Sequence, residues 1–448
     1  MAESTIDMTL IGDTSPPRGE SAILILSGVR GDTRRYRTIH PYEQLRLAGA
    51  DCFLSHITDP EVWTKAWQAS LVIIHRVAWN PTIERQFRSL RARGVLAIFD
   101  TDDLVFDPTA FCWIDSPDFQ DPLRVELYQE EMHRYRTTLE SCQAVMASTQ
   151  YLADHARELG KPVWVHRNAF SLEMLERSQA ALQGRYPARE KVIMGYASGT
   201  PTHNRDFAVA KLALLETLRR YPQVELWLVG PLDPGRDWGK LEDRVRRIGH
   251  VPWRKLPGVL AQFDINIAPL VADNPFGQSK SEIKYVEAGL VKVPTVATPT
   301  ESFRFAIRPG ENGYLAGDDA EWMETLAALV EHPDLRRALG EEAYQDVIQR
   351  YHPRVRSAEL VETLDQISLR ISSRPFWIPA QSEHASADDP QAVVRASRID
   401  PRIEHNPTLL RMAFHSLRYR GLGTLLKQVR VYLRRLAVPL FPYRTKKD

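Results

Sequence analysis

The sequence predicts an α/β protein with two doubly wound, parallel-sheet domains facing a cleft, followed by a basic helical C-terminal tail. Three observations lead to this prediction. Short, continuous apolar runs alternate with helical patterns, the alternation starts twice along the 448 residues, and residues 401–448 are strongly positive. Continuous apolar strands are expected where helices cover both faces of a parallel sheet. At roughly 100 to 200 residues per domain, this length also favours more than one domain.

The first domain is expected over residues 20–186. Helical patterns at 41–48 and 81–93 separate its early apolar runs, which is the rhythm of strand, helix and parallel strand. The expected strands are 22–26, 71–74, 96–99, 145–148 and 163–165.

The second domain is expected over residues 187–354, where the same rhythm restarts after a polar stretch. A helix is predicted at 205–221, and helices at 333–351 and 353–371 end the domain, so that residues 355–372 form a closing helix. Residues 373–400 are rich in Ser, Pro, Ala and Asp and predict a linker. The expected strands are 192–195, 224–229, 265–268 and 293–297.

Composition excludes several classes of protein. With 43% hydrophobic and 26% charged residues, the chain can bury a sizeable core. Cys52, Cys112 and Cys142 form no CxxC pair, which argues against a disulfide framework or a structural zinc site and favours a reducing compartment. The absence of a GxxxxGK[ST] motif excludes a P-loop NTPase.

The chain is expected to be cytoplasmic. Residues 1–19 are polar and acidic and do not resemble a secretory signal. Long apolar stretches such as 22–28 fall far short of the roughly 20 residues needed to span a bilayer.

The positive charge is confined to the tail. The whole chain carries +1, yet residues 401–448 hold eleven Lys or Arg against two acidic residues, or +9, which leaves −8 for the rest. Apolar residues between 409 and 436 recur at steps of three and four, and Gly421 and Gly423 divide them into two basic amphipathic helices. We expect this tail to bind an anionic membrane surface on the inner face of the cell membrane, as a peripheral protein. Packing onto another subunit is the alternative, and no nucleic-acid-reading motif accompanies the charge.

The strongest candidate for a ligand-binding site is the segment between Asn274 and Gly289. Lys280, Lys284 and Glu287 share one face of a predicted helix, because residues three and four positions apart are neighbours. Ammonium groups can hold phosphates and a carboxylate can accept hydrogen bonds from ribose hydroxyls. A solvated surface helix with a Lys284–Glu287 pair explains the same spacing.

In each expected domain, the loop that follows the first predicted strand is a candidate phosphate site. Residues 198–205 offer Ser198, Gly199 and Arg205, although any strand-to-helix turn needs small residues. Residues 28–37 offer flexible glycines and four arginines, and a solvated basic loop is the competing interpretation. The residues singled out there are Gly28, Gly31 and Arg37.

Three carboxylates follow the strand at 96–99, where cleft residues belong. Asp103 is our candidate proton acceptor, while Asp100 and Asp102 are as well explained by helix capping and turns. His75 and His203 are the other candidate bases, although a lone histidine is more often structural.

Residues 190–353 resemble the C-terminal domain of GT-B glycosyltransferases, especially glycosyltransferase family four, the group 1 glycosyl transferases. The resemblance lies in six motifs in the family's order: Gly195–Gly199, Trp227–Gly230, Ile248–Trp253, Phe263–Leu270, Lys284–Gly289 and Gly310–Leu315. It implies two Rossmann-like domains, a nucleotide-sugar donor with Glu287 on the ribose and Val251 to Trp253 beside the base, and no essential metal or other cofactor. It also implies that the helices after residue 353 return to the first domain.

One position departs from the family. The resemblance implies a second carboxylate eight residues before Glu287, but this position is Ser279. Either the Asn274 loop or Glu282 substitutes for it, or the donor sugar is held differently. Retention of anomeric stereochemistry, which the resemblance implies for this hexosyltransferase type, therefore stays open here.

The functional hypothesis is sugar transfer from a nucleotide sugar to a glycan or lipid-linked acceptor, in the synthesis of a surface polysaccharide or lipopolysaccharide. A non-catalytic nucleotide-sugar scaffold or sensor and a sugar epimerase of the same architecture are the alternatives. The base, the donor sugar, the acceptor and the oligomeric state are not specified by the sequence.

Overall fold

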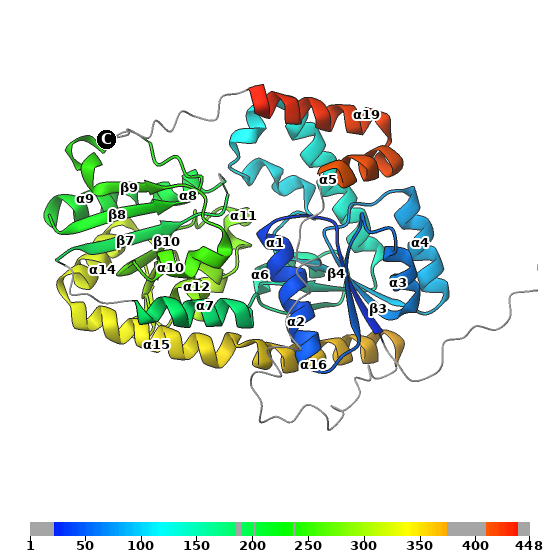
Figure 1. Ribbon diagram of the computed structural model, residues 1–448, viewed down its shortest axis with the longest axis horizontal. Helices are drawn as coiled ribbons and strands as arrows, with labels where there is room; N and C mark the ends of the chain where they lie inside the picture. The colour runs from blue at the N-terminus through cyan, green and yellow to red at the C-terminus, as the bar shows by residue number, and fades with distance from the viewer. Residues whose placement is uncertain (1–21, 185–189, 201, 236–237, 374–408, 438–448) are drawn as a thin grey trace, which may run out of the picture.

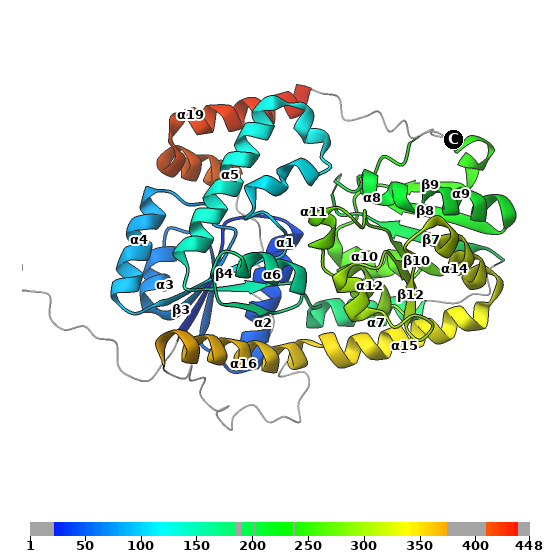
Figure 2. The same cartoon turned by 180° about the vertical axis from the view of Figure 1, so that it is seen from behind.

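The structure is a computed structural model that describes residues 22–184, 190–200, 202–235, 238–373 and 409–437. Figures 1 and 2 show two α/β domains side by side, with a long pair of helices running along both of them. The predicted linker beyond residue 373, and the tail residues 401–408 and 438–448, lie outside the described residues.

The first domain contains a six-stranded, all-parallel sheet in the order β2-β1-β3-β4-β5-β6. Its order changes direction between β1 and β3, so the loops after these two strands meet at the cleft edge of the sheet. Its strands are β1 Ala22–Ser27, β2 Cys52–His56, β3 Ala69–His75, β4 Leu96–Thr101, β5 Ala144–Ala147 and β6 Val163–Val165. Its helices are α1 Asp32–Arg34, η1 Arg35–Ile39, α2 His40–Leu47, α3 Val62–Gln68, α4 Pro81–Ala92, η2 Pro108–Trp113, η3 Pro117–Gln120, α5 Pro122–Ser141 and α6 Gln150–Arg157, and the next helix, α7 Leu172–Gln183, packs against the second domain.

The second domain contains another six-stranded parallel sheet, in the order β12-β11-β10-β7-β8-β9, which changes direction between β7 and β10. The helix predicted at 205–221 is two helices separated at Ala210. The strands are β7 Val192–Ala197, β8 Val224–Val229, β9 Val245–Ile248, β10 Ile265–Ala268, β11 Thr295–Ala297 and β12 Gly313–Leu315. The helices are α8 Asn204–Val209, α9 Lys211–Arg220, η4 Gly239–Arg244, η5 Trp253–Lys255, α10 Leu256–Leu260, α11 Pro275–Gln278, α12 Ile283–Gly289, α13 Glu301–Ala306, α14 Asp319–Glu331 and α15 Pro333–Tyr351, and the last of the series, α16 Pro353–Ser372, returns to the first domain.

Helices cover both faces of each sheet, which confirms the predicted doubly wound architecture. In the first sheet, Leu24 and Leu26 pack toward α3, α4, α5 and α6, whereas Ile23 and Ile25 pack toward α2 and α16. Leu360 of α16 is completely buried in the second of these layers, together with Leu364 and Ile367. At about 1.5–3 kcal/mol for each buried side chain, this contact fastens the closing helix to the first domain, as the family resemblance implied.

The chain passes between the domains at two places that touch each other. The first crossing is residues 166–171 and the second is the α15–α16 junction at His352. The rings of Phe170 and His352 lie edge to face, with centroids 5.9 Å apart. The first crossing precedes the boundary expected at 186/187, because α7 packs against α10 of the second domain through Ala181 and Leu182.

The C-terminal tail is helical over the described residues, as α19 Leu409–Ala437, with a non-helical residue at Gly421 where a break was expected. This helix packs against α5 of the first domain. Arg420 forms an ion pair with Glu131 of α5 at 3.0 Å, and Lys427 pairs with Glu126 at 2.5 Å. Figures 1 and 2 both show α19 lying across α5. In the part of the chain that the structure describes, no helix is long and apolar enough to cross a membrane.

Candidate active site

A cavity of about 220 Å³ lies between the carboxyl ends of the two sheets. The first domain supplies side chains from the loops after β1 and β4, and the second domain supplies the loop after β7 and the start of α12. This is where open parallel sheets bind ligands. Nine sequence-predicted residues line it: Asp103, His203, Ser198, Gly199, Val251, Trp253, Lys280, Lys284 and Glu287.

Glu287 lies on the second-domain wall and faces the first domain. Its carboxylate accepts a hydrogen bond from the Tyr36 hydroxyl and lies 4.0 Å from Nη2 of Arg35. Burial raises the pKa of Glu287 above its ordinary value, although Arg35 and Tyr36 act in the opposite direction. Sequence reasoning missed Arg35 and Tyr36, although Arg35 belongs to the arginine-rich loop that it singled out.

Two lysines stand on the same wall as Glu287. Lys284 is partly buried and donates to the carbonyl oxygen of Ala197, at the end of β7. Burial lowers its pKa to about 8; Lys280 contributes in the same direction and Glu287 opposes it. Nζ of Lys280 lies 2.7 Å from Oδ1 of Asp103 across the cleft.

The backbone around Ser198 shapes the floor of the cleft. Gly230, which follows β8, has a φ of +99°, and a Cβ atom there would lie 1.8 Å from the carbonyl oxygen of Ser198. Only glycine permits this close approach of the loops after β7 and β8. The Ser198 hydroxyl donates to the carbonyl of Thr200 at 2.7 Å and so holds the turn.

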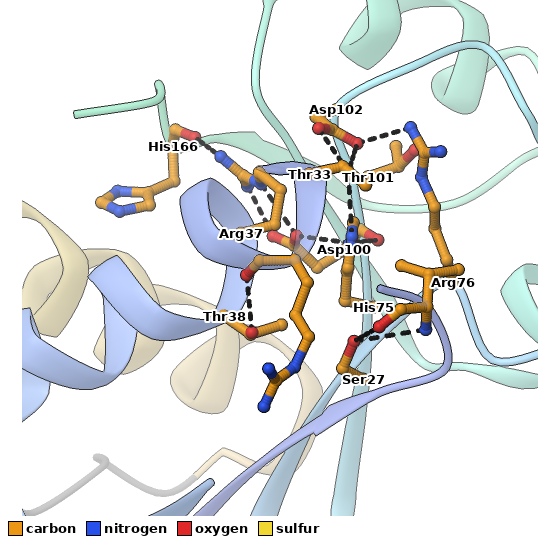
Figure 3. A network of polar contacts seen from close by, with 12 residues as sticks. Ser27, Thr33, Arg37, Thr38, His75, Arg76, Asp100, Thr101, Asp102 and His166 are labelled. Carbon is orange, nitrogen blue, oxygen red and sulfur yellow. Dashed lines mark hydrogen bonds and ion pairs between the residues drawn. The ribbon is translucent and has the colours of Figure 1, made fainter. Parts of the chain in front are cut away.

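Asp100, near the end of β4, has a different partner from Asp102 and Asp103, which follow the strand; Figure 3 shows Asp100 beside Arg37 and Asp102 beside Thr33 and Arg76. Asp100 is buried against Arg37, whereas Asp102 and Asp103 both pair with Arg76. The hydroxyl of Thr33 lies 2.6 Å from Oδ2 of Asp102. Burial raises the pKa of Asp102, but Arg76 outweighs it and the result is a pKa of about 2.

Arg76 occupies a strained position at the end of β3. Its φ of +48° is in the left-handed region, which non-glycine residues rarely adopt. Such strain is typical of residues held in place at functional sites. Here it directs one guanidinium onto two neighbouring carboxylates, so Asp103 is engaged by Arg76 on one oxygen and by Lys280 on the other.

His203 lies in the cleft before α8. Its Nδ1 is 2.8 Å from Oδ2 of Asp206, which orients the ring with Nε2 as the remaining proton acceptor. Burial lowers the pKa of His203 below its ordinary value, and Lys284 and Lys280 contribute in the same direction while Asp206 opposes it. A neutral imidazole in this place can accept a proton. His75, by contrast, is completely buried between Thr33 and Asp100 and does not line the cleft.

Five of the predicted residues are not brought to the cleft. The Arg37 guanidinium is completely buried, because it pairs with Asp100 and also donates to the carbonyl of His166 and to Asn168. Gly31 provides a positive φ of +88° before α1. The others are Arg205, 71% exposed beside Asp115; Asn274, which caps α11 and donates to the carbonyl of Trp113; and Gly28, which lines a different cavity.

The position of the missing family carboxylate is also buried. Ser279 is completely buried and donates to the carbonyl of Phe276 at 2.7 Å. Glu282 is 1% exposed and is bound by Tyr351 at 2.9 Å and by Arg167 at 3.4 Å. Neither Ser279 nor Glu282 lines the cleft, so Glu282 does not take the place of a donor-sugar carboxylate in this state. The loop's Asn274 is likewise occupied by Trp113.

Comparison with known proteins connects this geometry to a family. Residues 210–362 match the family model described as glycosyl transferase-like. Phosphatidyl-myo-inositol mannosyltransferase of Mycobacterium leprae is 27% identical over 191 residues, 41% of this chain and 48% of that protein. The Mycobacterium tuberculosis protein of the same name is 27% identical over 203 residues, 43% of this chain and 51% of that protein. The match thus spans about half the length of these relatives.

Solved structures show the same fold over most of the chain. Anabaena HepE in complex with UDP has a TM-score of 0.51 and 17% identity, covering 77% of this chain and all of HepE. Sucrose-phosphate synthase from Thermosynechococcus elongatus has a TM-score of 0.53 and 15% identity, covering 78% of this chain and all of that protein. The chain therefore has the two-domain GT-B fold, and its residues 210–362 are similar to the glycosyl transferase-like family.

Proposed function

We propose that this protein is a glycosyltransferase that moves a sugar from a nucleotide-sugar donor to a glycan or lipid-linked acceptor, in the synthesis of a surface polysaccharide or glycolipid. The observation that carries the proposal is the cleft wall formed by Lys280, Lys284 and Glu287. It places two ammonium groups beside a buried carboxylate, and a nucleoside diphosphate presents the matching phosphates and ribose hydroxyls. The mycobacterial relatives, named as mannosyltransferases, and the UDP-bound HepE support this assignment.

The donor would replace contacts that now join the domains. The ribose takes the place of the Tyr36 hydroxyl on Glu287, and the phosphates attract Lys280 away from Asp103. Nη1 of Arg35 is buried without a hydrogen-bond partner among the described residues, so a ligand oxygen would satisfy it. The Trp253 ring, already stacked under Arg35 at 4.8 Å, lies beside the base.

We assign acceptor activation to the side of the cleft with Asp103 and His203. His203 is neutral and oriented by Asp206, whereas Asp103 has to release Lys280 or Arg76 before it can take a proton. Donor phosphates that draw Lys280 away would provide this release. We propose retention of configuration, which the resemblance to the group 1 glycosyl transferases implies.

Sugar transfer is tested in two steps. A thermal-shift screen of UDP, GDP, ADP, TDP and CMP sugars identifies the donor, since a ligand at 100 times its dissociation constant stabilises the fold by about 2.7 kcal/mol. Turnover with candidate acceptors is then compared for wild type, Asp103→Asn and His203→Asn, and proton NMR gives the anomeric configuration of the product. Absence of binding by every nucleotide sugar removes the proposal, and binding with neither transfer nor hydrolysis supports a sensor instead.

Lys284 gives donor binding a specific pH dependence. Its pKa of about 8 means that the ammonium is charged below pH 8 and is lost as the pH rises through 8. We expect the affinity for nucleoside diphosphate to fall between pH 7 and pH 9, while the affinity for the free nucleoside stays constant. Lys284→Arg should abolish the fall, because arginine stays protonated. Calorimetry at three pH values measures this, with the exposed Arg205→Gln as control; a flat wild-type profile would contradict it.

We further propose that α19 holds the protein to the anionic inner face of the cell membrane. Leu410 and Phe414 are 80% and 62% exposed, and the basic residues of the same helix flank them. Each cation near such a surface contributes about 1 kcal/mol. Leu410→Gln combined with Phe414→Gln should reduce co-sedimentation with anionic vesicles and leave nucleotide affinity unchanged. If the wild-type protein ignores anionic vesicles at low salt, this attachment is wrong.

A further inference from the structure

A second cavity, of about 470 Å³, lies between α19 and the first domain. It is larger than the cleft and falls within the roughly 300–1,000 Å³ typical of small-molecule sites. Its walls are mostly apolar and come from the loops after β1 and β3, from α5 and from the inward side of α19. Val29, Val77, Met412, Ala413, Leu425 and Val429 are among the residues that line it.

This cavity lies directly behind the acceptor side of the cleft. The loop after β1 contributes residues to both spaces, and the loop after β3 lines the cavity and pairs with residues of the cleft. Arg30 lines the cavity and Thr33 lines the cleft, three positions further on, which is at most about 11 Å of chain. After β3, Val77 lines the cavity while Arg76 binds the cleft carboxylates Asp102 and Asp103. A ligand with a polar head at the cleft can therefore extend an apolar part into the cavity.

Polar groups in the cavity wall indicate a ligand that has oxygen atoms as well as a hydrocarbon chain. Arg30 is exposed and forms no ion pair with the described residues, so its guanidinium is available to an anion. Ser416 is 4% exposed, and its hydroxyl has no hydrogen-bond partner among the described residues. Buried polar atoms without a partner are uncommon and call for one. A phosphate or ester oxygen at the cavity mouth provides it.

The opposite side of α19 indicates where such a ligand comes from. Leu410, Phe414 and Leu426 point away from the cavity walls and are more than half exposed. Large apolar side chains that several turns of one helix leave exposed are typical of a contact with a membrane or another protein. The same helix thus presents one apolar side to the solvent and the other to a cavity.

We propose that this cavity receives the hydrocarbon chain of a phosphate-bearing lipid acceptor, with Arg30 holding the phosphate and the sugar-accepting end directed to the cleft. This inference rests on the proposed sugar transfer and specifies the class of acceptor. The lipid passes from the bilayer around α19 into the cavity, so α19 is both the membrane contact and one wall of the acceptor site.

The test is a chain-length series of alkyl phosphates, from four to twelve carbons, titrated below their critical micelle concentrations into the full chain. Affinity should rise roughly fourfold for each methylene until the cavity is full and then level off. Ala413→Trp fills the cavity and should remove this dependence. Leu410→Trp, on the exposed side of the same helix, should preserve it. If Ala413→Trp does not fold, Val429→Trp at the half-exposed rim replaces it.

The phosphate end is tested separately. Arg30→Gln should weaken alkyl phosphates about tenfold or more and leave alkyl alcohols of equal length unaffected, whereas Arg430→Gln, a cation outside the cavity, should change neither. Inorganic phosphate alone should bind weakly to every variant. Chain-length independence in the wild type, or a dependence that survives in Ala413→Trp or its replacement Val429→Trp, overturns the cavity assignment even if sugar transfer to a short, water-soluble acceptor occurs. A chain-length dependence without any nucleotide-sugar binding leaves the cavity standing and removes the proposed transfer.

Discussion

Glu287→Ala should reduce the affinity for the nucleotide-sugar donor by about 10- to 150-fold and make sugar transfer undetectable at ordinary donor concentrations. The ribose hydroxyls lose a charged acceptor, and a hydrogen bond to a charged group contributes about 1.5–3 kcal/mol. The carboxylate lies in the cleft with only 12% of its side chain exposed, so water cannot fully replace it. Calorimetric titration with the donor measures the effect.

The control for this prediction is Glu341→Ala. Glu341 is a carboxylate 45% exposed on α15, paired with Lys292, and it does not line the cleft. Its loss should leave donor affinity within a factor of two. A Glu287→Ala protein that keeps its melting temperature and its donor affinity would show that the ribose binds elsewhere. Tyr36→Phe provides a further comparison, because it removes the hydroxyl that competes for Glu287 and should not weaken the donor.

Arg37→Met should lower the free energy of unfolding by about 3–5 kcal/mol, the cost of leaving one partner of a buried ion pair without the other. Arg37 and Asp100 are both completely buried, with 2.5 Å between Nη2 and Oδ2. Double replacement by Arg37→Met and Asp100→Asn should recover much of the loss, since the buried charge is then gone. Urea-induced unfolding followed by circular dichroism measures the difference, and the exposed Arg30→Met is the control.

The same pair predicts an acid limit. Burial raises the pKa of Asp100, but Arg37 outweighs it and holds the pKa below its ordinary value. The stabilisation is therefore present above the ordinary aspartate pKa of about 3.9 and is lost as the pH falls through the lower folded value. Arg37→Met should consequently lose less stability between pH 7 and pH 3 than the wild type does. An Arg37→Met protein as stable as the wild type at pH 7 would contradict both expectations.

The sequence predicted most of the framework because apolar strands carry their own signal. It missed β2 at Cys52–His56, whose residues Cys-Phe-Leu-Ser-His lack the β-branched character of the other strands. It also did not predict β9 at Val245–Ile248 or β12 at Gly313–Leu315, which is only three residues long. All three strands lie at the edges of their sheets, where pairing to a single neighbour places the weakest demand on residue type.

The candidate site was predicted better on the second domain than on the first. Lys280, Lys284 and Glu287 lie close together in sequence, so their spacing predicts one shared face. For the arginine-rich loop, local spacing does not indicate which arginine faces the cleft. Arg37 is buried because it pairs with Asp100, 63 residues away, and Arg35 lines the cleft instead. A short π-helix at residues 35–39 sets this register, and local propensity does not predict π-helices. The tail's apolar periodicity likewise predicts a helix but not which side packs against α5.

The contact between the two domain crossings determines how the molecule can open. Because Phe170 and His352 touch, both connections between the domains pass through one small region, which Arg356 binds further through His166 and the carbonyl of Arg167. Such an arrangement acts as a pivot: a small rotation there moves the far rim of the cleft most and the crossing residues least. A rotation of this kind would separate Tyr36 from Glu287, which face each other across the cleft, whereas α16 would move with the first domain to which it is fastened. The ease of such a rotation is thus set by a few residues that do not line the cleft.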